Sequence, residues 1–208
     1  MTGRHESITD TMYLQATAMK TLSVLLSLVL LSFTGCTTKN AGSSEMTSTP
    51  KWQASIRKHL PLLGHRNWIL VVDKAFPEQN APGLVTINTD ADLLTVLDYT
   101  MRQIDSSTHV RPIIYCDAEL QHISKEQVPG IQAFRDSLTR TLKGARPEVI
   151  LHESVFAKID EASKLFKVLV LKTNGTIAYS SVFLQLDCKY WSAENEATLR
   201  KAMRATQH

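Results

Sequence analysis

Histidine, carboxylate and phenol side chains stand beside short apolar runs in this chain. His65 precedes the apolar run Trp68–Val72, and Asp73 follows that run directly. His152 precedes a predicted helix, and Tyr179 lies in the segment after a later apolar run. An imidazole with a pKa of about 6.5 takes up or releases a proton near neutral pH, so it can serve as a general acid or base. Because α/β proteins bind ligands at the ends of their strands, these residues predict acid–base chemistry at a strand end.

Each of these residues also has a purely structural interpretation. His65 could cap the first helix, and Asp73 could cap the turn that follows the apolar run. Tyr179 could pack as an ordinary strand aromatic, and His152 could be a structural histidine. Glu119, which follows another apolar run, could simply face solvent. The sequence alone leaves these alternatives open.

Strands and helices mostly alternate along the chain, which predicts an α/β domain of three layers around a central, mostly parallel sheet. The pair Asn174-Gly175 between two apolar runs is a strong hairpin signal, so the sequence also predicts a late β-hairpin. Periodicity and capping residues place the elements as follows: helices over about 52–64, 91–104, 126–142, 153–166 and 192–204, and strands over about 68–72, 84–88, 110–116, 148–151, 167–173 and 176–187.

The N-terminal region reads as targeting sequence followed by a tether. Residues 22–33 form a run of 12 residues that is almost wholly apolar and is followed by Thr34-Gly35-Cys36. The run is shorter than the roughly 20 residues that cross a bilayer, but it has the length of a signal-peptide core. Small residues before a cysteine resemble the bacterial lipobox, which predicts lipidation of Cys36; a plain signal peptide or a peripheral helix is the alternative.

Three segments follow from this interpretation: an N-terminal extension with a lipoprotein-type signal peptide over 1–36, a flexible Ser/Thr-rich tether over 37–50, and a folded domain over 51–208. The domain is then expected in the periplasm of a bacterial envelope, held by a lipid anchor. Thr37 after the cysteine favours the outer membrane over the inner one.

Charge and cysteine content exclude some classes of function. The net charge of +3 is small and dispersed, so the sequence predicts no nucleic-acid partner. No Cys-x-x-Cys or His-x-x-x-His spacing, phosphate loop or dinucleotide fingerprint occurs, so no metal and no cofactor is expected. An oxidising envelope would permit a disulfide between Cys116 and Cys188, and the sequence leaves this pairing open.

A family resemblance appears at Gly64-His65, at Asp73 with Ala75, Phe76 and Pro77 after it, and more weakly at Tyr179. Here the chain resembles the D-ribose pyranase and L-fucose mutarotase family. The resemblance covers roughly residues 56–184. It implies an α/β fold, interconversion of sugar ring forms or anomers without a cofactor, and assembly into ring-like homo-oligomers.

The resemblance assigns roles to five residues. His65 matches the catalytic histidine, while Asp73 and Tyr179 match residues that bind the sugar. Ser181 stands where the family motif has Asn, and His152 is the nearest candidate for a second His or Arg that the family has in the neighbouring region. Two functions are therefore expected: a mutarotase or pyranase acting on a monosaccharide by histidine acid–base catalysis, or a non-catalytic sugar-binding or envelope interaction protein that keeps the fold.

Spacing adds a prediction about assembly. His65 and Asp73 are separated by eight positions across a strand, and an extended chain rises about 3.3 Å per residue. Their Cα atoms would then lie roughly 25 Å apart, too far to share one small sugar. The spacing therefore favours a site built from two subunits over a turn at Gly64 that folds His65 back.

Overall fold

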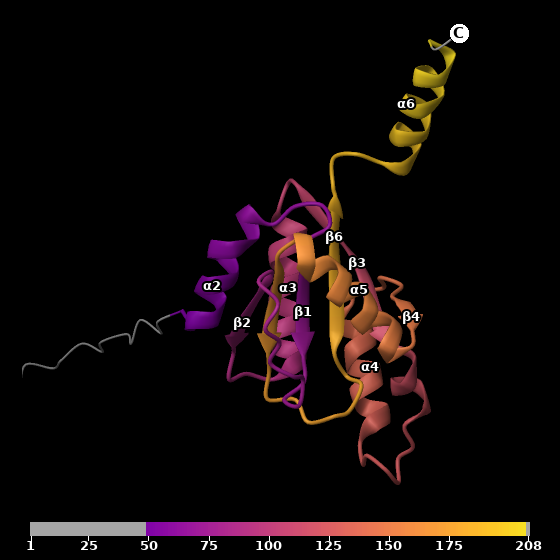
Figure 1. Cartoon of the computed structure of the whole chain (residues 1–208). Helices are drawn as coiled ribbons and strands as arrows, with labels where there is room; N and C mark the ends of the chain where they lie inside the picture. The colour runs from indigo at the N-terminus through magenta and orange to yellow at the C-terminus, as the bar shows by residue number, and fades with distance from the viewer. Residues whose placement is uncertain (1–48, 207–208) are drawn as a thin grey trace, which may run out of the picture. The chain divides into compact units, whose positions relative to one another are not determined.

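The computed structural model describes residues 49–206 (Figure 1). The predicted lipidation site Cys36, the signal peptide over 1–36 and nearly all of the tether over 37–50 lie outside the described residues. None of the helices within residues 49–206 has the length and apolar character needed to cross a membrane.

A six-stranded sheet forms the centre of the fold, with strand order β2-β5-β1-β6-β3-β4. Strands β2, β5 and β1 are mutually parallel, as are β3 and β4, while β6 runs antiparallel to both of its neighbours. The predicted α/β class with a mostly parallel sheet is thus confirmed. The strands are β1 (Trp68–Val72), β2 (Leu84–Asn88), β3 (Val110–Asp117), β4 (Glu148–Ile150), β5 (Val168–Lys172) and β6 (Val182–Cys188).

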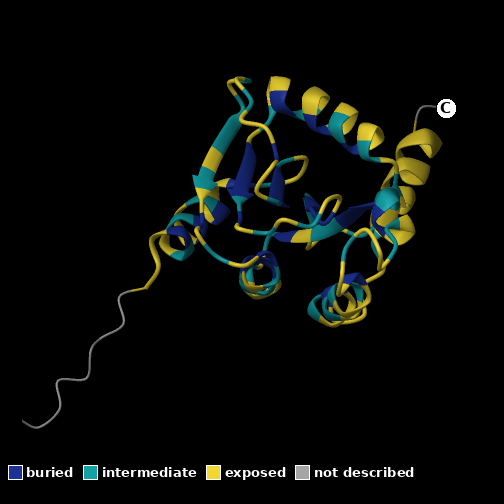
Figure 2. Cartoon of the chain, turned by 90° about the horizontal axis from the view of Figure 1, so that it is seen from below, coloured by how far each residue is buried: buried dark blue, intermediate teal, exposed yellow. Residues whose placement is uncertain are grey.

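Helices cover both faces of the sheet, and each face has its own apolar core (Figure 2). Alternate residues of the central strand β1 enter the two cores: Ile69 and Val71 on one face, and Trp68, Leu70 and Val72 on the other. Helices α2, α3 and α4 pack on the first face, whereas α5 alone packs on the second. The helices are α2 (Lys51–His59), η1 (Leu60–Leu62), α3 (Leu93–Ser106), η2 (Ala118–His122), α4 (Ile131–Thr141), α5 (His152–Leu165) and α6 (Ala193–Ala205).

The predicted late β-hairpin is wrong. Strands β5 and β6 are consecutive in sequence, yet β1 lies between them in the sheet. A two-residue type I′ turn needs positive φ at both central residues, and neither Asn174 nor Gly175 has one. Instead, residues 174 and 175 form hydrogen bonds with two other loops. Asn174 N–H donates to the Ala91 carbonyl, and Lys74 N–H donates to the Gly175 carbonyl. These contacts hold the connection over the end of β1 and place β6 on its far side.

Candidate functional site

Five polar or aromatic residues lie close together at one end of the sheet, beyond the last residues of its strands. The register pairs Val182 of β6 with Val71 of β1 and with Cys116 of β3. The residues just beyond these pairs therefore lie at the same end of the sheet. At this end β1, β3 and β4 finish and β6 begins. The group formed there, called the strand-end cluster below, consists of Asp73, Asp117, His152, Tyr179 and Ser181.

The centre of the strand-end cluster is a histidine–carboxylate pair. His152 Nδ1 lies 2.8 Å from Asp117 Oδ2, and the Asp117 side chain is fully buried whereas that of His152 is 29% exposed. Because an ionised carboxylate only accepts hydrogen bonds, Nδ1 carries the proton and Nε2 carries the lone pair. Nε2 has no hydrogen-bond partner among residues 49–206, so it is available to exchange a proton with a ligand.

Burial disfavours the charge on Asp117. It raises the pKa of Asp117 to about 6, although the hydrogen bond and charge of His152 act in the opposite direction. The negative charges of Glu119 and Asp73 raise that pKa further. Oδ1 of Asp117 is buried and has no partner within the described part of the chain. A buried carboxylate with a raised pKa and an unpartnered oxygen makes this group a candidate functional site.

Glu119 fixes the start of α5. Both oxygens of its carboxylate accept the backbone N–H of His152, at 3.2 and 3.1 Å. An acidic group at a helix N-terminus satisfies a free N–H and favours the positive end of the helix dipole. The structure thus gives Glu119 the task of holding His152 in place at the first residue of α5.

Tyr179 stands against the histidine ring. The two ring centroids are 5.2 Å apart and the rings are perpendicular, while Phe156 packs on the His152 ring at 4.6 Å. Tyr179 has a φ of 57°, in the left-handed region that is unfavourable for a side chain with a Cβ. Its side chain is therefore held at the rim of the cluster by the surrounding loop, with 38% of the residue exposed.

Asp73 and Ser181 form a reciprocal pair. The Ser181 hydroxyl donates to Asp73 Oδ2 at 3.0 Å and accepts the Asp73 N–H at 3.1 Å. The other carboxylate oxygen of Asp73 accepts the N–H of Ala75. A hollow of about 410 Å³ borders Asp73 beside the loop of residues 176–178, which is within the size range of small-ligand sites.

His65 lies at the opposite end of β1. Its Nδ1 is 3.0 Å from Asp187 Oδ1, and Arg111 donates two hydrogen bonds to the other oxygen of Asp187. Since Asp187 and Ser181 are six positions apart along β6, the two sites are about 20 Å apart in one chain. The structure therefore brings Asp73, His152, Tyr179 and Ser181 together and leaves His65 apart, as the sequence spacing predicts.

Hydrogen bonds keep Asp187 charged. Partial desolvation is the largest single effect and opposes ionisation, but the bonds from Arg111, the Cys188 backbone and His65 together lower the pKa of Asp187. His65 lines a hollow of about 720 Å³ together with Tyr190 and Trp191. A second His–carboxylate pair thus occupies the other end of the sheet.

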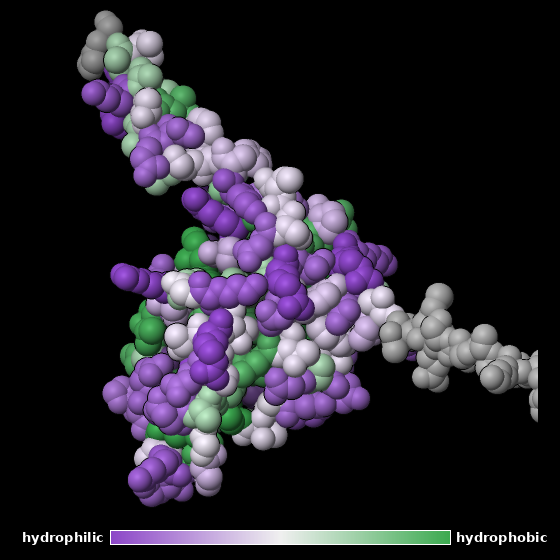
Figure 3. Space-filling view, turned by 180° about the vertical axis from the view of Figure 1, so that it is seen from behind, coloured by the Kyte–Doolittle hydropathy of each residue, from purple (hydrophilic) through white to green (hydrophobic). Residues whose placement is uncertain are grey.

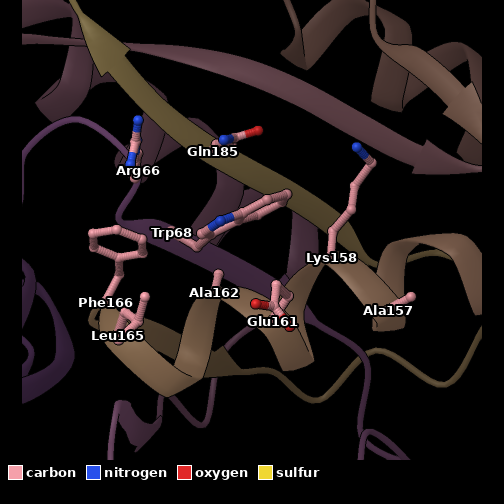
Figure 4. Close-up of a pocket in the computed structure, with 9 residues that line it drawn as sticks. All are labelled: Arg66, Trp68, Ala157, Lys158, Glu161, Ala162, Leu165, Phe166 and Gln185. Atoms are coloured by element: carbon pink, nitrogen blue, oxygen red, sulfur yellow. The ribbon is translucent and has the colours of Figure 1, made fainter.

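A further hollow of about 470 Å³ lies between α5 and the sheet (Figure 4). Trp68 forms its floor, with Gln185 of β6 on one side and Lys158 of α5 on the other. Arg66 borders it and lies over the Phe166 ring at 5.9 Å from the centroid. This hollow is at the His65 end of β1 and contains no member of the strand-end cluster.

Two cysteines, Cys116 and Cys188, lie in the part of the chain that the structure describes. Cys116 and Cys188 lie at opposite ends of the paired strands β3 and β6 and are both free thiols. Burial raises the pKa of Cys116 to about 12, so it stays protonated. Within residues 49–206, His, Cys, Asp and Glu side chains form no group of three that could hold a metal ion.

Sequence reasoning missed Asp117, the most deeply buried carboxylate of the site. A signal was present, because Asp117 follows an apolar strand directly, just as Asp73 does. Glu119 drew attention instead, since it stands in the loop that the family resemblance covers. The role of Asp117 depends on its distance to His152, 35 positions away, which no local pattern reveals.

Similarity to known proteins is found in structure and not in sequence. No protein-family model matches the chain, and no characterised protein matches it in sequence. Among solved structures it resembles Bacillus subtilis RbsD complexed with D-ribose, with a TM-score of 0.46, 17% identity, and coverage of 64% of this chain and 92% of that one. It also resembles the Streptococcus pneumoniae fucose mutarotase in complex with L-fucose, with a TM-score of 0.47, 17% identity, and coverage of 68% and 98%.

FucU from Bifidobacterium longum is a further similar structure, with a TM-score of 0.42, 14% identity, and coverage of 64% of this chain and 94% of that one. At TM-scores below 0.5 and identities below 20%, these likenesses by themselves assign neither a family nor an activity to the chain.

Proposed function

We propose that the chain interconverts the anomers or ring forms of a monosaccharide at the strand-end cluster. The observation that carries the proposal is the pairing of His152 Nδ1 with the buried carboxylate of Asp117, which leaves Nε2 as the nitrogen that can accept a proton from a ligand. The motif resemblance at Gly64-His65 and Asp73 supports a sugar as the ligand. No cofactor enters the proposed reaction.

The reaction needs one group that removes a proton and one that supplies one. In the ring-opening step, His152 Nε2 takes the proton from the anomeric hydroxyl, the bond between the anomeric carbon and the ring oxygen breaks, and the ring oxygen takes up a proton. The open-chain sugar then rotates about the bond between its carbonyl carbon and the neighbouring carbon. The two proton transfers run in reverse as the ring closes. Asp117 stabilises the imidazolium formed on His152 through the bond at Nδ1.

Tyr179 and Asp73 are the proposed sugar-binding groups. The Tyr179 hydroxyl can donate a hydrogen bond, and its exposed ring can lie against the apolar face of a sugar. Asp73 is held by Ser181 and by the N–H of Ala75, so its carboxylate is fixed in orientation before a ligand arrives. A fixed acceptor loses less entropy on binding than a mobile one.

His65 enters the proposal through a second subunit. Its pairing with Asp187 matches the pairing of His152 with Asp117, and within one chain it cannot reach the strand-end cluster. We therefore keep the two-subunit assembly as part of the proposal: His65 of one copy supplies the second proton-transfer group to the cluster of another. A homo-oligomer is required for this arrangement.

A non-catalytic sugar-binding or envelope interaction protein is the second candidate. One observation favours it: the Ser181 hydroxyl is directed at Asp73, and the residue is almost fully buried, so it offers nothing to a ligand. A protein with this role would bind a monosaccharide at Asp73 and Tyr179 without accelerating its isomerisation.

For location, we propose attachment to the bacterial envelope through a lipid on Cys36, with the domain in the periplasm and the outer membrane favoured. The support comes from the apolar run over 22–33 and the small residues before Cys36. Labelling with a radioactive fatty acid tests it: wild type should incorporate the label and Cys36→Ala should not.

NMR exchange spectroscopy on a panel of ribose, fucose and galactose tests the activity. We expect wild type to accelerate exchange between anomers or ring forms of at least one sugar, and His152→Ala to lose most of the acceleration. His122→Ala is the matched control, since His122 is an exposed histidine outside the cluster. Binding without acceleration would support the second candidate, and neither binding nor acceleration would reject both.

A further inference from the structure

The segment that joins β6 to α6 lies at the His65 end of the sheet. Strand β6 runs antiparallel to β1, so β6 ends at Cys188 near the point where β1 begins. His65 precedes β1, and α6 follows β6 from this same end. In Figures 1 and 3 α6 projects here from the body that the other helices form with the sheet. Residues of the joining segment and His65 line one hollow.

Two aromatic side chains of this segment border the hollow. Tyr190 and Trp191 are 74% and 41% exposed, and they line the hollow of about 720 Å³ together with His65. That volume lies within the range of small-ligand sites. An exposed aromatic ring can lie against the apolar face of a sugar while neighbouring polar groups bond the sugar hydroxyls.

Trp191 is held in one orientation by α6. Its indole N–H donates to Glu196 Oε2 at 2.8 Å, and the other oxygen of Glu196 accepts a hydrogen bond from Arg200 Nε at 2.7 Å. Glu196 and Arg200 are one helical turn apart, and both line the hollow. A ring fixed in this way before a ligand arrives loses less entropy on binding than a mobile ring.

Hydrogen-bonding groups remain available around the hollow. Nδ1 of His65 is bonded to Asp187, and within residues 49–206 its Nε2 has no partner. Arg111 and Arg200 each bond a carboxylate of the chain and keep further N–H groups for a ligand. Hydroxyl groups of a sugar both donate and accept, so they match this mixture of donors and acceptors.

The charges around the hollow almost balance. The charged side chains that line it, apart from His65, are Arg66, Arg111, Asp187, Glu196 and Arg200. Two of the three arginines bond these carboxylates, and Arg66 lies over the Phe166 ring. Glu194 is also close: its hydrogen bond with Ser192 is the main cause that lowers its pKa, and the charge of Arg111 contributes. A neutral polyhydroxy ligand therefore suits the hollow better than an anion.

We propose that Trp191 is a sugar-binding residue whose indole ring supports the apolar face of the monosaccharide at His65. The inference rests on the proposed function, in which the sugar contacts His65 of one copy and the strand-end cluster of another. It adds a specificity-determining contact to the His65 half of that site. Glu196 has a positioning role, because it acts on the sugar only through the indole of Trp191.

Tryptophan fluorescence tests the contact without depending on catalysis. The chain has three tryptophans, and Trp52 and Trp68 are only 6% and 2% exposed, so a change in emission on adding sugar reports chiefly on Trp191. Full-length chain in a mild non-ionic detergent is titrated with ribose, fucose and galactose, and with inorganic phosphate as an anion probe. We expect at least one sugar to change the emission of wild type and to leave that of Trp191→Phe unchanged.

Calorimetric titration and the NMR exchange assay measure what the ring contributes. Trp191→Ala should weaken sugar binding about tenfold and raise KM by a similar factor with kcat nearly unchanged, because the ring contacts the ground state and the transition state equally. Glu196→Ala should weaken binding by a smaller factor, since the indole becomes mobile. Glu196→Gln keeps an acceptor for the indole N–H and should bind within about twofold of wild type.

Leu199→Ala is the matched control, because Leu199 lies on α6 with a similar exposed fraction of 43% and is not among the residues that line the hollow. Circular dichroism checks that the variants keep their helices. Sugar binding as tight in Trp191→Ala as in this control would overturn the inference and leave the proposed function standing. An emission response to phosphate and to none of the sugars would also overturn it. If no sugar binds wild type, the inference is overturned together with the proposed function.

Discussion

Replacing Asp117 by Asn removes a buried negative charge while keeping the shape of the side chain. In wild type the pKa of Asp117 is raised from 3.8 to about 6. Since one pKa unit equals about 1.4 kcal/mol, holding this carboxylate ionised in the folded chain costs roughly 3 kcal/mol at neutral pH. The hydrogen bond from His152 offsets part of the desolvation cost of the ionised carboxylate. The raised pKa already includes this effect.

The sign of the pH dependence follows from the raised pKa. Between about pH 4 and pH 6 the folded chain binds a proton that the unfolded chain has released, so stability falls as the pH rises. The full cost is present above about pH 6 and absent below about pH 4. The stability of D117N minus that of wild type should therefore grow by roughly 3 kcal/mol from pH 4 to pH 7.

Urea unfolding of both proteins at four pH values across this range measures the difference directly. Asp187→Asn, measured over the same range and also below pH 4, is the matched control, because the pKa of Asp187 is lowered and its effect must have the opposite sign. D187N should be destabilised at pH 7, and this loss should fade as the pH falls below about 4. A D117N difference that is flat with pH, or that shrinks towards pH 7, would refute the burial of an ionised Asp117.

Three further perturbations test the surrounding structure. Ser181→Ala removes both hydrogen bonds to Asp73 and should lower the free energy of unfolding by about 1–3 kcal/mol; an unchanged urea midpoint would show that water replaces the hydroxyl fully. Gly83→Ala brings a Cβ against the carbonyl oxygens of Ser163 and Phe166 and should cost about 1–3 kcal/mol in thermal or urea unfolding; a stability equal to wild type would contradict the tight packing there. H65A and H152A should each be inactive in sugar exchange, but an equal mixture should regain activity if each site combines both residues from different subunits, and a mixture as inactive as its parts would contradict the two-subunit site.

Local patterns predicted most of the framework. The apolar run of β1 is buried at all five positions, as a strand covered on both faces should be, and Ser192 caps α6 through the N–H of Asn195. The hairpin failed because pairing in a sheet is decided by the whole sheet: β1 is the best-buried strand, and it occupies the place beside β5 that the hairpin would need.

The candidate site was predictable only in part. Asp73 and Tyr179 stood out because titratable and aromatic residues beside apolar runs mark strand ends. The partnership of His152 with Asp117, and that of His65 with Asp187, could not be foreseen, since each joins residues from strands or helices far apart in sequence. Burial of Asp117 depends in the same way on α5 packing across the end of β3, which is a property of the assembled fold.

The central claim is that His152 acts as the acid–base group. It is tested most directly by comparing the rate of sugar ring interconversion in the presence of His152→Ala with the rate in the presence of wild type. Two-dimensional NMR exchange spectroscopy on the responsive sugar gives both rates under the same conditions. The proposed acid–base role predicts a loss of about 10²–10⁴-fold in the catalysed rate, with the fold intact by circular dichroism. A folded His152→Ala chain that accelerates exchange as well as wild type would contradict it.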